Sequence, residues 1–140
     1  MMKSFSYLFI FFLTAISSNA FSQQIQKEMI VGKWQPYLST LEAYDFTGKK
    51  EVKTDSKFSA NDIMQFNADG SINDGGQRYY SYSIEPDTKT LYLFDELHYE
   101  KKFEISQLDK TTMKLIMRVA ETHNERTSRG IWTLILKRKK

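Results

Sequence analysis

The chain contains no cysteine, and this absence excludes several kinds of chemistry. Without cysteine there is no disulfide, no thiolate zinc site and no cysteine nucleophile. A bacterial lipoprotein also needs a cysteine directly after its signal cleavage site, so anchoring by that route is excluded. The folded chain must therefore be held together by the packing of its side chains.

Histidine is almost as scarce, with His98 and His123 the two examples. Neither lies in a His-Glu-x-x-His helix or at paired metal-ligand spacing, and the chain has no Gly-x-Ser-x-Gly elbow and no glycine-rich phosphate loop. Glu100 and Glu104 would share a strand face as an acid/base pair, but Lys102 lies between them as on an ordinary solvated face. We therefore predict that the protein is not an enzyme and has no metal or cofactor.

Long hydrophobic runs are missing beyond the first 22 residues. Lys3 and the apolar stretch 7–16 resemble the n-region and h-region of a secretory signal peptide, with small-x-small cleavage sites at 18–20 and 20–22. The run is shorter than the roughly 20 residues that span a bilayer. We predict a signal peptide at 1–22 and a periplasmic or secreted protein without a stable membrane anchor; an anchored N-terminal helix is the alternative.

The remaining residues, 23–140, are expected to form one domain. A domain of about 118 residues buries enough surface to form one stable hydrophobic core without a covalent cross-link. Loss of Lys3 with the signal lowers the formal charge from +3 to +2. A charge so close to neutral argues against a nucleic-acid partner.

The dominant hydrophobic period is two, which predicts strands. A short helix at 24–30 would precede them, and Pro36 would end or bulge the first strand because it has no amide donor. Asp69-Gly70 predicts a tight turn and is a poor match to a calcium loop. The polar segments 48–60 and 121–128 are predicted to be loops. The expected strands are 30–35, 62–67, 71–73, 78–84, 90–94, 97–108, 113–119 and 130–138.

Short connections and the absence of a helical crossover favour sequential antiparallel pairing. Closing such a sheet removes its exposed edges. The predicted fold is therefore all-β: an eight-stranded antiparallel up-and-down β-barrel with a short N-terminal helix.

Four motifs carry a resemblance to a known family: Gly32-Lys33-Trp34, the segment 66–70 (FNADG), the hairpin 82–93 and the hairpin 103–115. In this order and spacing the chain resembles the small secreted lipocalin-like, calycin-type barrels of Bacteroidetes-type bacteria, over nearly all of the processed chain. The resemblance implies a barrel whose cavity takes small hydrophobic molecules in related proteins. It implies no particular ligand.

The barrel geometry makes one contact predictable. In a closed meander the end of the last strand meets the start of the first, so Arg138 is expected beside Trp34. Lipocalins similarly place an arginine over the tryptophan of the Gly-x-Trp motif, a cation–π contact. The alternative is that Arg138 belongs to a frayed basic tail. Gly32, Trp34 and Arg138 are thus predicted to be structural.

The candidate ligand contacts are residues near the middle of the strands whose side chains are expected to face the barrel interior. Tyrosine hydroxyls and methionine thioethers suit an irregular, mostly apolar pocket. Lys101 would meet an anionic head group, because an inward ammonium needs a counter-charge or water; outward flipping at a bulge or snorkelling to the barrel mouth are its alternatives. The candidates are Met64, Phe66, Tyr80, Tyr82, Tyr99, Lys101, Phe103, Met113 and Met117.

Two functions remain open. The first is a binding protein of the cell envelope that carries or sequesters a small hydrophobic molecule, such as a fatty acid, inside the barrel. The second is a filled barrel that binds another envelope protein through its outer face or rim loops. Tyr79, Tyr92 and Phe94, on the predicted outward parity, would form an aromatic patch for the second function.

Overall fold

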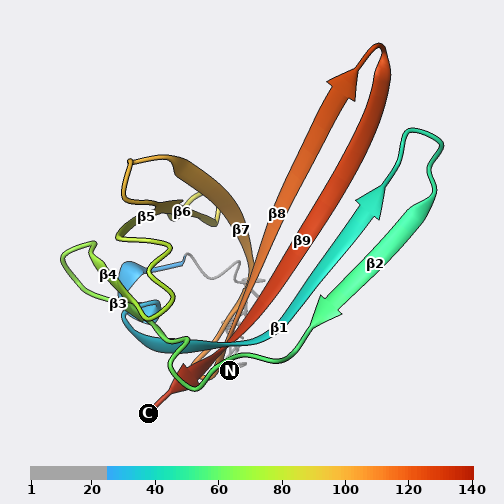
Figure 1. The fold of residues 1–140 in the computed structure, drawn as a ribbon. Helices are drawn as coiled ribbons and strands as arrows, with labels where there is room; N and C mark the ends of the chain where they lie inside the picture. Colours follow the sequence, from blue (N-terminus) through green and yellow to red (C-terminus); the bar gives the residue numbers. More distant parts are fainter. Residues whose placement is uncertain (1–24) are drawn as a thin grey trace, which may run out of the picture.

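Antiparallel strands form nearly all of the protein in the computed structural model, which describes residues 25–140 (Figure 1). The predicted signal peptide lies outside the described residues. A short 3₁₀ helix, η1 (Lys27–Met29), precedes the first strand, where the sequence predicts a helix. Among residues 25–140 no helix is long and apolar enough to cross a membrane.

Eight of the nine strands form the barrel in the predicted sequential order. They neighbour one another as β4-β3-β1-β9-β8-β7-β6-β5, and β2 pairs with β1 alone. The strands are β1 (Gly32–Tyr44), β2 (Lys50–Asp55), β3 (Met64–Phe66), β4 (Ile72–Asp74), β5 (Ser81–Glu85), β6 (Thr90–Phe94), β7 (Glu100–Leu108), β8 (Thr112–His123) and β9 (Arg126–Lys139).

The barrel is nearly closed. β1 and β9 run side by side from the pair Lys33–Lys139 to the pair Tyr44–Arg129. Between β4 and β5 the contact is a single bridge, with the Ile72 amide donating to the Tyr80 carbonyl and the Tyr82 amide to the Gly70 carbonyl, each at 2.9 Å. The predicted all-β antiparallel eight-stranded barrel is confirmed.

One continuous hydrophobic core fills the barrel. The side chains facing inward from the strands alternate with exposed ones, as a half-buried strand requires. Ten large residues from six of the strands and from the turn before β1 have relative accessibilities of 0–2%. They are Ile30, Trp34, Met64, Phe66, Leu91, Leu93, Phe103, Met113, Leu115 and Leu136.

Pro36 bulges the first strand and does not end it. The register between β1 and β9 shifts between Pro36 and Leu38, which leaves Tyr37 as the extra residue. A bulge tolerates the missing proline amide and increases the local twist. β1 then continues to Tyr44, so the chain leaves the barrel as a strand.

Two segments predicted as loops contain strand residues, and for those residues the predictions were wrong. Residues 50–55 form β2, and residues 121–128 complete the β8–β9 hairpin, whose turn is Asn124-Glu125 with φ values of 49° and 63°. Both segments have water on each face of the sheet. The alternation of apolar and polar residues that reveals a half-buried strand is therefore missing.

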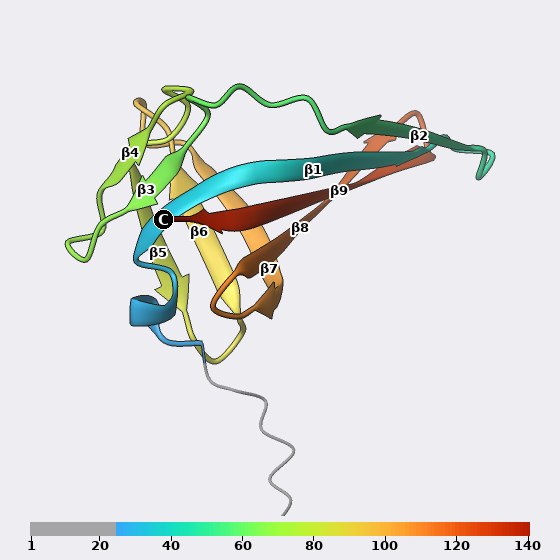
Figure 2. The ribbon, with the colours of Figure 1, turned by 90° about the horizontal axis from the view of Figure 1, so that it is seen from below.

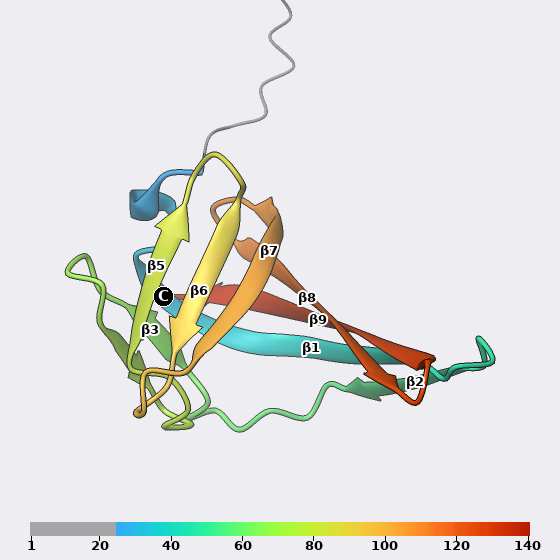
Figure 3. The same ribbon diagram turned by 90° about the horizontal axis from the view of Figure 1, so that it is seen from above.

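Together these segments build a four-stranded arm that projects from the barrel (Figures 2 and 3). The arm comprises residues 41–55 and 117–132, with its strands in the order β2-β1-β9-β8. β7 pairs with β8 only as far as Ile116, and beyond that point β8 has no outer neighbour in the described chain. The arm is thus a two-faced sheet with two open edges.

Asp109 organises the turn between β7 and β8. Its carboxylate accepts hydrogen bonds from the backbone amides of Thr111 (2.9 Å) and Thr112 (2.8 Å) and from the side chain of Gln107 (3.0 Å). These donors favour the charged form, led by the Thr111 amide, and lower the pKa of Asp109 from 3.8 to about 2.

The lowered pKa of Asp109 predicts a pH-dependent contribution to stability. A carboxyl group whose folded pKa is depressed stabilises the fold above its unfolded pKa and loses that effect as the pH falls through the folded pKa. The difference in urea midpoint between the wild type and Asp109→Ala should be constant above pH about 4 and shrink between pH about 4 and 2. A constant difference down to pH 2 would contradict the role of the charged form.

Candidate functional site

Trp34 and Arg138 seal one end of the barrel. The Trp34 indole is fully buried and donates a hydrogen bond to the Ile30 carbonyl at 2.8 Å. Trp34 pairs with Arg138 in the β1–β9 register, and the guanidinium carbon lies 4.2 Å from the ring centroid. The contact predicted from the sequence is present, and Arg138 does not belong to a frayed tail.

The guanidinium of Arg138 also binds three backbone carbonyls. It donates to Val31 (2.9 Å), Met29 (2.7 Å) and Lys110 (2.9 Å). Gly32 allows this approach, because a Cβ atom there would lie 2.5 Å from Nη1 of Arg138 and the glycine φ is 131°. The Gly-x-Trp motif thus joins the N-terminal turn, the first strand and the last strand.

Five of the nine predicted ligand contacts are core residues. Met64, Phe66, Tyr82, Phe103 and Met113 are buried and belong to the same cluster. Met117 is half-buried against it. A cavity able to hold a ligand would leave the side chains that line it accessible to water, whereas four of these five have relative accessibilities of 0–2%. The barrel around them is filled by its own side chains.

Three other predicted contacts face solvent, so their predicted inward orientation was wrong. Tyr80 and Tyr99 are 46% and 69% exposed, and Lys101 is exposed with its ammonium 5.7 Å from the ring centroid of Tyr79. Tyr80 and Tyr99 precede the strands to which they were assigned. The alternation of side chains between the two faces of a strand therefore does not determine which way they point. Lys101 shares the parity of Phe103 but extends to the barrel surface, as the snorkelling alternative describes.

The predicted outer aromatic patch does not form. Tyr79 is buried, and Tyr92 and Phe94 are half-buried. Residues 75–80 lie outside the strands, which shifts the inward position from Tyr80 to Tyr79.

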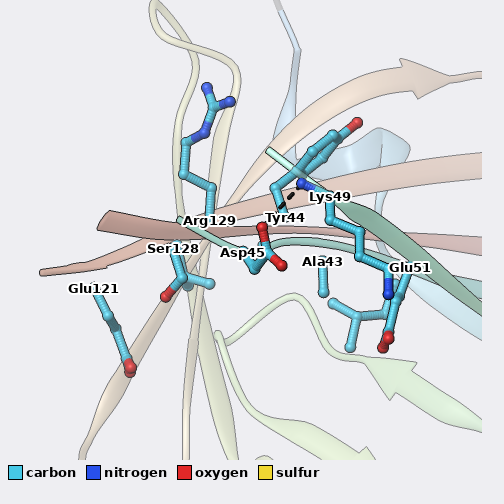
Figure 4. A pocket seen from close by; sticks show the side chains of 11 residues that line it. Ala43, Tyr44, Asp45, Lys49, Glu51, Glu121, Ser128 and Arg129 are labelled. Carbon is cyan, nitrogen blue, oxygen red and sulfur yellow. Dashed lines mark hydrogen bonds between the residues drawn. The ribbon is translucent and has the colours of Figure 1, made fainter. Parts of the chain in front are cut away.

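One exposed apolar surface lies on the arm, as an outward continuation of the barrel interior. Beyond the half-buried pair Met117 and Trp132, the same sheet face carries Leu41 (40% exposed) and Val119 (50% exposed). An open groove of about 500 Å³ follows this face, and we call it the arm groove (Figure 4). Its lining includes Leu41, Ala43, Glu51, Val119, Glu121 and Gly130.

Small residues form the floor of the arm groove. Ala43, Gly130 and Val119 are neighbours across three strands. A Cβ atom at Gly130 would lie 3.1 Å from a methyl carbon of Val119 and 3.9 Å from one of Leu41. The missing side chain therefore leaves a depression between the two exposed apolar residues.

The two faces of the arm differ in chemistry. On the groove side, Glu51, Glu121 and Ser128 surround the apolar floor, whereas Tyr44 and Arg129 project from the opposite side (Figure 4). On that second side the Tyr44 ring lies 5.8 Å from the Lys50 ammonium and 5.5 Å from the Arg129 guanidinium. The sequence prediction missed this site, because it placed half of these residues in loops.

The described chain offers no metal-binding cluster of histidine or carboxylate groups. His98 lies in a turn with a positive φ, before β7 begins, and His123 ends β8 at the tip of the arm. Asp69 and Gly70 form a turn in which Asp69 binds the Ser71 amide at 2.9 Å.

The chain matches no protein-family model, and comparisons with curated proteins and with solved structures found no match.

Proposed function

We propose that this protein is a non-enzymatic binding protein of the cell envelope that recognises another envelope protein through the arm groove. One observation carries the proposal: the barrel interior is filled, while its apolar face continues uncovered onto the arm through Leu41 and Val119. The antiparallel meander and the Trp34–Arg138 contact support a lipocalin-like relationship. The predicted signal peptide supports the envelope location.

A protein fits the arm groove better than a small molecule does. Small-molecule sites bury most of the surface of their ligand, typically 70–90%. The arm groove lies on one face of a sheet that projects clear of the barrel, and no element of the described chain covers it (Figures 2 and 3). A partner surface with apolar side chains would cover Leu41 and Val119 together and would meet the carboxylate of Glu121 with a basic residue at its rim.

Native mass spectrometry of protein purified from its own cell envelope tests this proposal. We expect a second, different polypeptide to accompany the wild type and to be lost from Val119→Asp, because a buried charge at the groove centre disfavours binding. Ser106→Asp, on an exposed position of β7, is the matched control and should retain the partner. The melting temperatures of both variants should stay close to that of the wild type.

Two results would contradict the proposal. One is a small molecule bound to the wild type, which would favour the carrier function. The other is a polypeptide that Val119→Asp retains as well as Ser106→Asp does.

A further inference from the structure

The outer edge of β2 is an open edge with an unusual order of charges. β2 pairs with β1 alone, and within residues 25–140 nothing pairs with its other side (Figure 1). All six residues of β2 are exposed. The ladder extends one residue further, because the Asp45 amide donates to the Lys49 carbonyl at 3.0 Å. Within the segment 49–55 (KKEVKTD), alternate residues direct their backbone amide and carbonyl groups away from β1, and nothing in residues 25–140 pairs with them.

The charged residues at odd positions of this edge lie on the groove side of the arm. Glu51 and Lys53 are opposite Ala43 and Leu41 on β1, so neither has a charged neighbour across the strand. Among the described residues neither forms an ion pair; Lys50, on the other side, pairs with Glu42 at 3.8 Å. The charges of Glu51 and Lys53 are therefore available to a partner.

We infer that β2 pairs antiparallel with β2 of a second copy of this chain, about a two-fold axis at Val52. In this register Glu51 lies opposite Lys53 of the second copy, and Lys49 lies opposite Asp55. The symmetry repeats each pair, so four opposite-charge pairs line one face. On the other face Val52, which is 53% exposed, meets its own copy. Opposite charges and β-branched residues facing each other both stabilise an antiparallel pair.

The two adjacent registers of the same edge are disfavoured. A two-fold axis perpendicular to the sheet requires residues of the same face to be opposite each other. Centring on Lys53 places the two Lys53 side chains together and Glu51 opposite Asp55. Centring on Glu51 places the two Glu51 side chains together and Lys49 opposite Lys53. Of these three registers, the one centred on Val52 is therefore the one that places opposite charges across from each other.

The open edge of β8 lacks this symmetry. Its charged residues Arg118 and Glu121 lie on opposite faces, and Arg118 already pairs with Glu104. Edge charges of one sign usually prevent strand pairing. On β2 the signs alternate instead, which makes the edge complementary to itself. The dimer would be closed and isologous, with one continuous sheet through both arms.

Analytical ultracentrifugation of the purified protein tests the inference with charge reversals. We expect a dimer for the wild type, weakened at high salt because exposed charge pairs are screened. Glu51→Lys and Lys53→Glu should each raise the dimer dissociation constant about tenfold or more, since each places like charges opposite one another twice. The control Lys102→Glu, on the exposed side of β7, should not.

Two rescues identify the register. The double variant Glu51→Lys/Lys53→Glu should regain the wild-type dissociation constant. An equimolar mixture of the two single variants should form a heterodimer, because its lysines then face glutamates at both positions. The inference would be overturned if the wild type were monomeric at all concentrations. It would also be overturned if the dimer dissociation constant were the same in the wild type and the charge-reversal variants.

This test uses the purified protein alone and reads its own mass. Its failure would leave the proposed groove partner unaffected. Loss of the groove partner in Val119→Asp would likewise leave the β2 dimer intact, because Val119 lies on β8, at the opposite edge of the arm.

Discussion

Replacing Trp34 with alanine should cost about 3–5 kcal/mol of unfolding free energy, the usual range for removing a buried aromatic residue. Trp34 is fully buried, its indole nitrogen binds the Ile30 carbonyl, and its ring supports the Arg138 guanidinium. For a domain of this size, we expect the melting temperature to fall by more than about 10 °C. Thermal unfolding followed by circular dichroism measures the change.

Tyr99→Ala is the matched control for Trp34→Ala. It removes an aromatic ring of similar kind from a position that is 69% exposed. A substitution at such a position typically changes stability by less than about 0.5 kcal/mol. Equal melting temperatures for the two variants would show that Trp34 does not seal the core.

Replacing Arg138 with methionine should lower the unfolding free energy by about 2–3 kcal/mol. Methionine keeps an apolar chain over Trp34 but leaves the carbonyls of Met29, Val31 and Lys110 without their charged donor. Arg138→Lys should recover only part of the loss, because one ammonium cannot reproduce the planar fork of the guanidinium. Urea unfolding monitored by tryptophan fluorescence gives the values.

Lys139→Met provides the comparison for Arg138→Met. Lys139 is the next residue of β9, is exposed, and loses the same charge on substitution. If both variants unfold at the same urea concentration, the carbonyl contacts of Arg138 contribute nothing to stability.

The barrel strands could be predicted because each has one solvent-exposed face and one buried face. The alternation of Phe103 and Ile105 with Glu104, or of Leu91 and Leu93 with Tyr92, reports that difference directly. Sequential pairing then placed Trp34 beside Arg138. These features follow from local pattern and closure alone.

The arm could not be predicted in the same way. Glu51, Lys53 and Glu121 lie in strands that have water on both faces, and their polarity is the same as that of a loop. The partners that stabilise these strands are backbone groups of neighbouring strands, which the side chains do not reveal. The site errors have a related cause: Tyr80 and Tyr99 lie just before strands begin, where the parity of side chains no longer holds.

β9 runs without interruption from the tip of the arm at Arg126 to the barrel seal at Arg138. Its hydrogen bonds to β1 extend over nearly this whole length, so a force that pulls along the arm loads many of them in shear at the same moment. Strands loaded in this way resist separation far better than strands peeled apart bond by bond. A load applied to the arm would therefore reach the barrel along the strand that carries Arg138, the arginine that seals it.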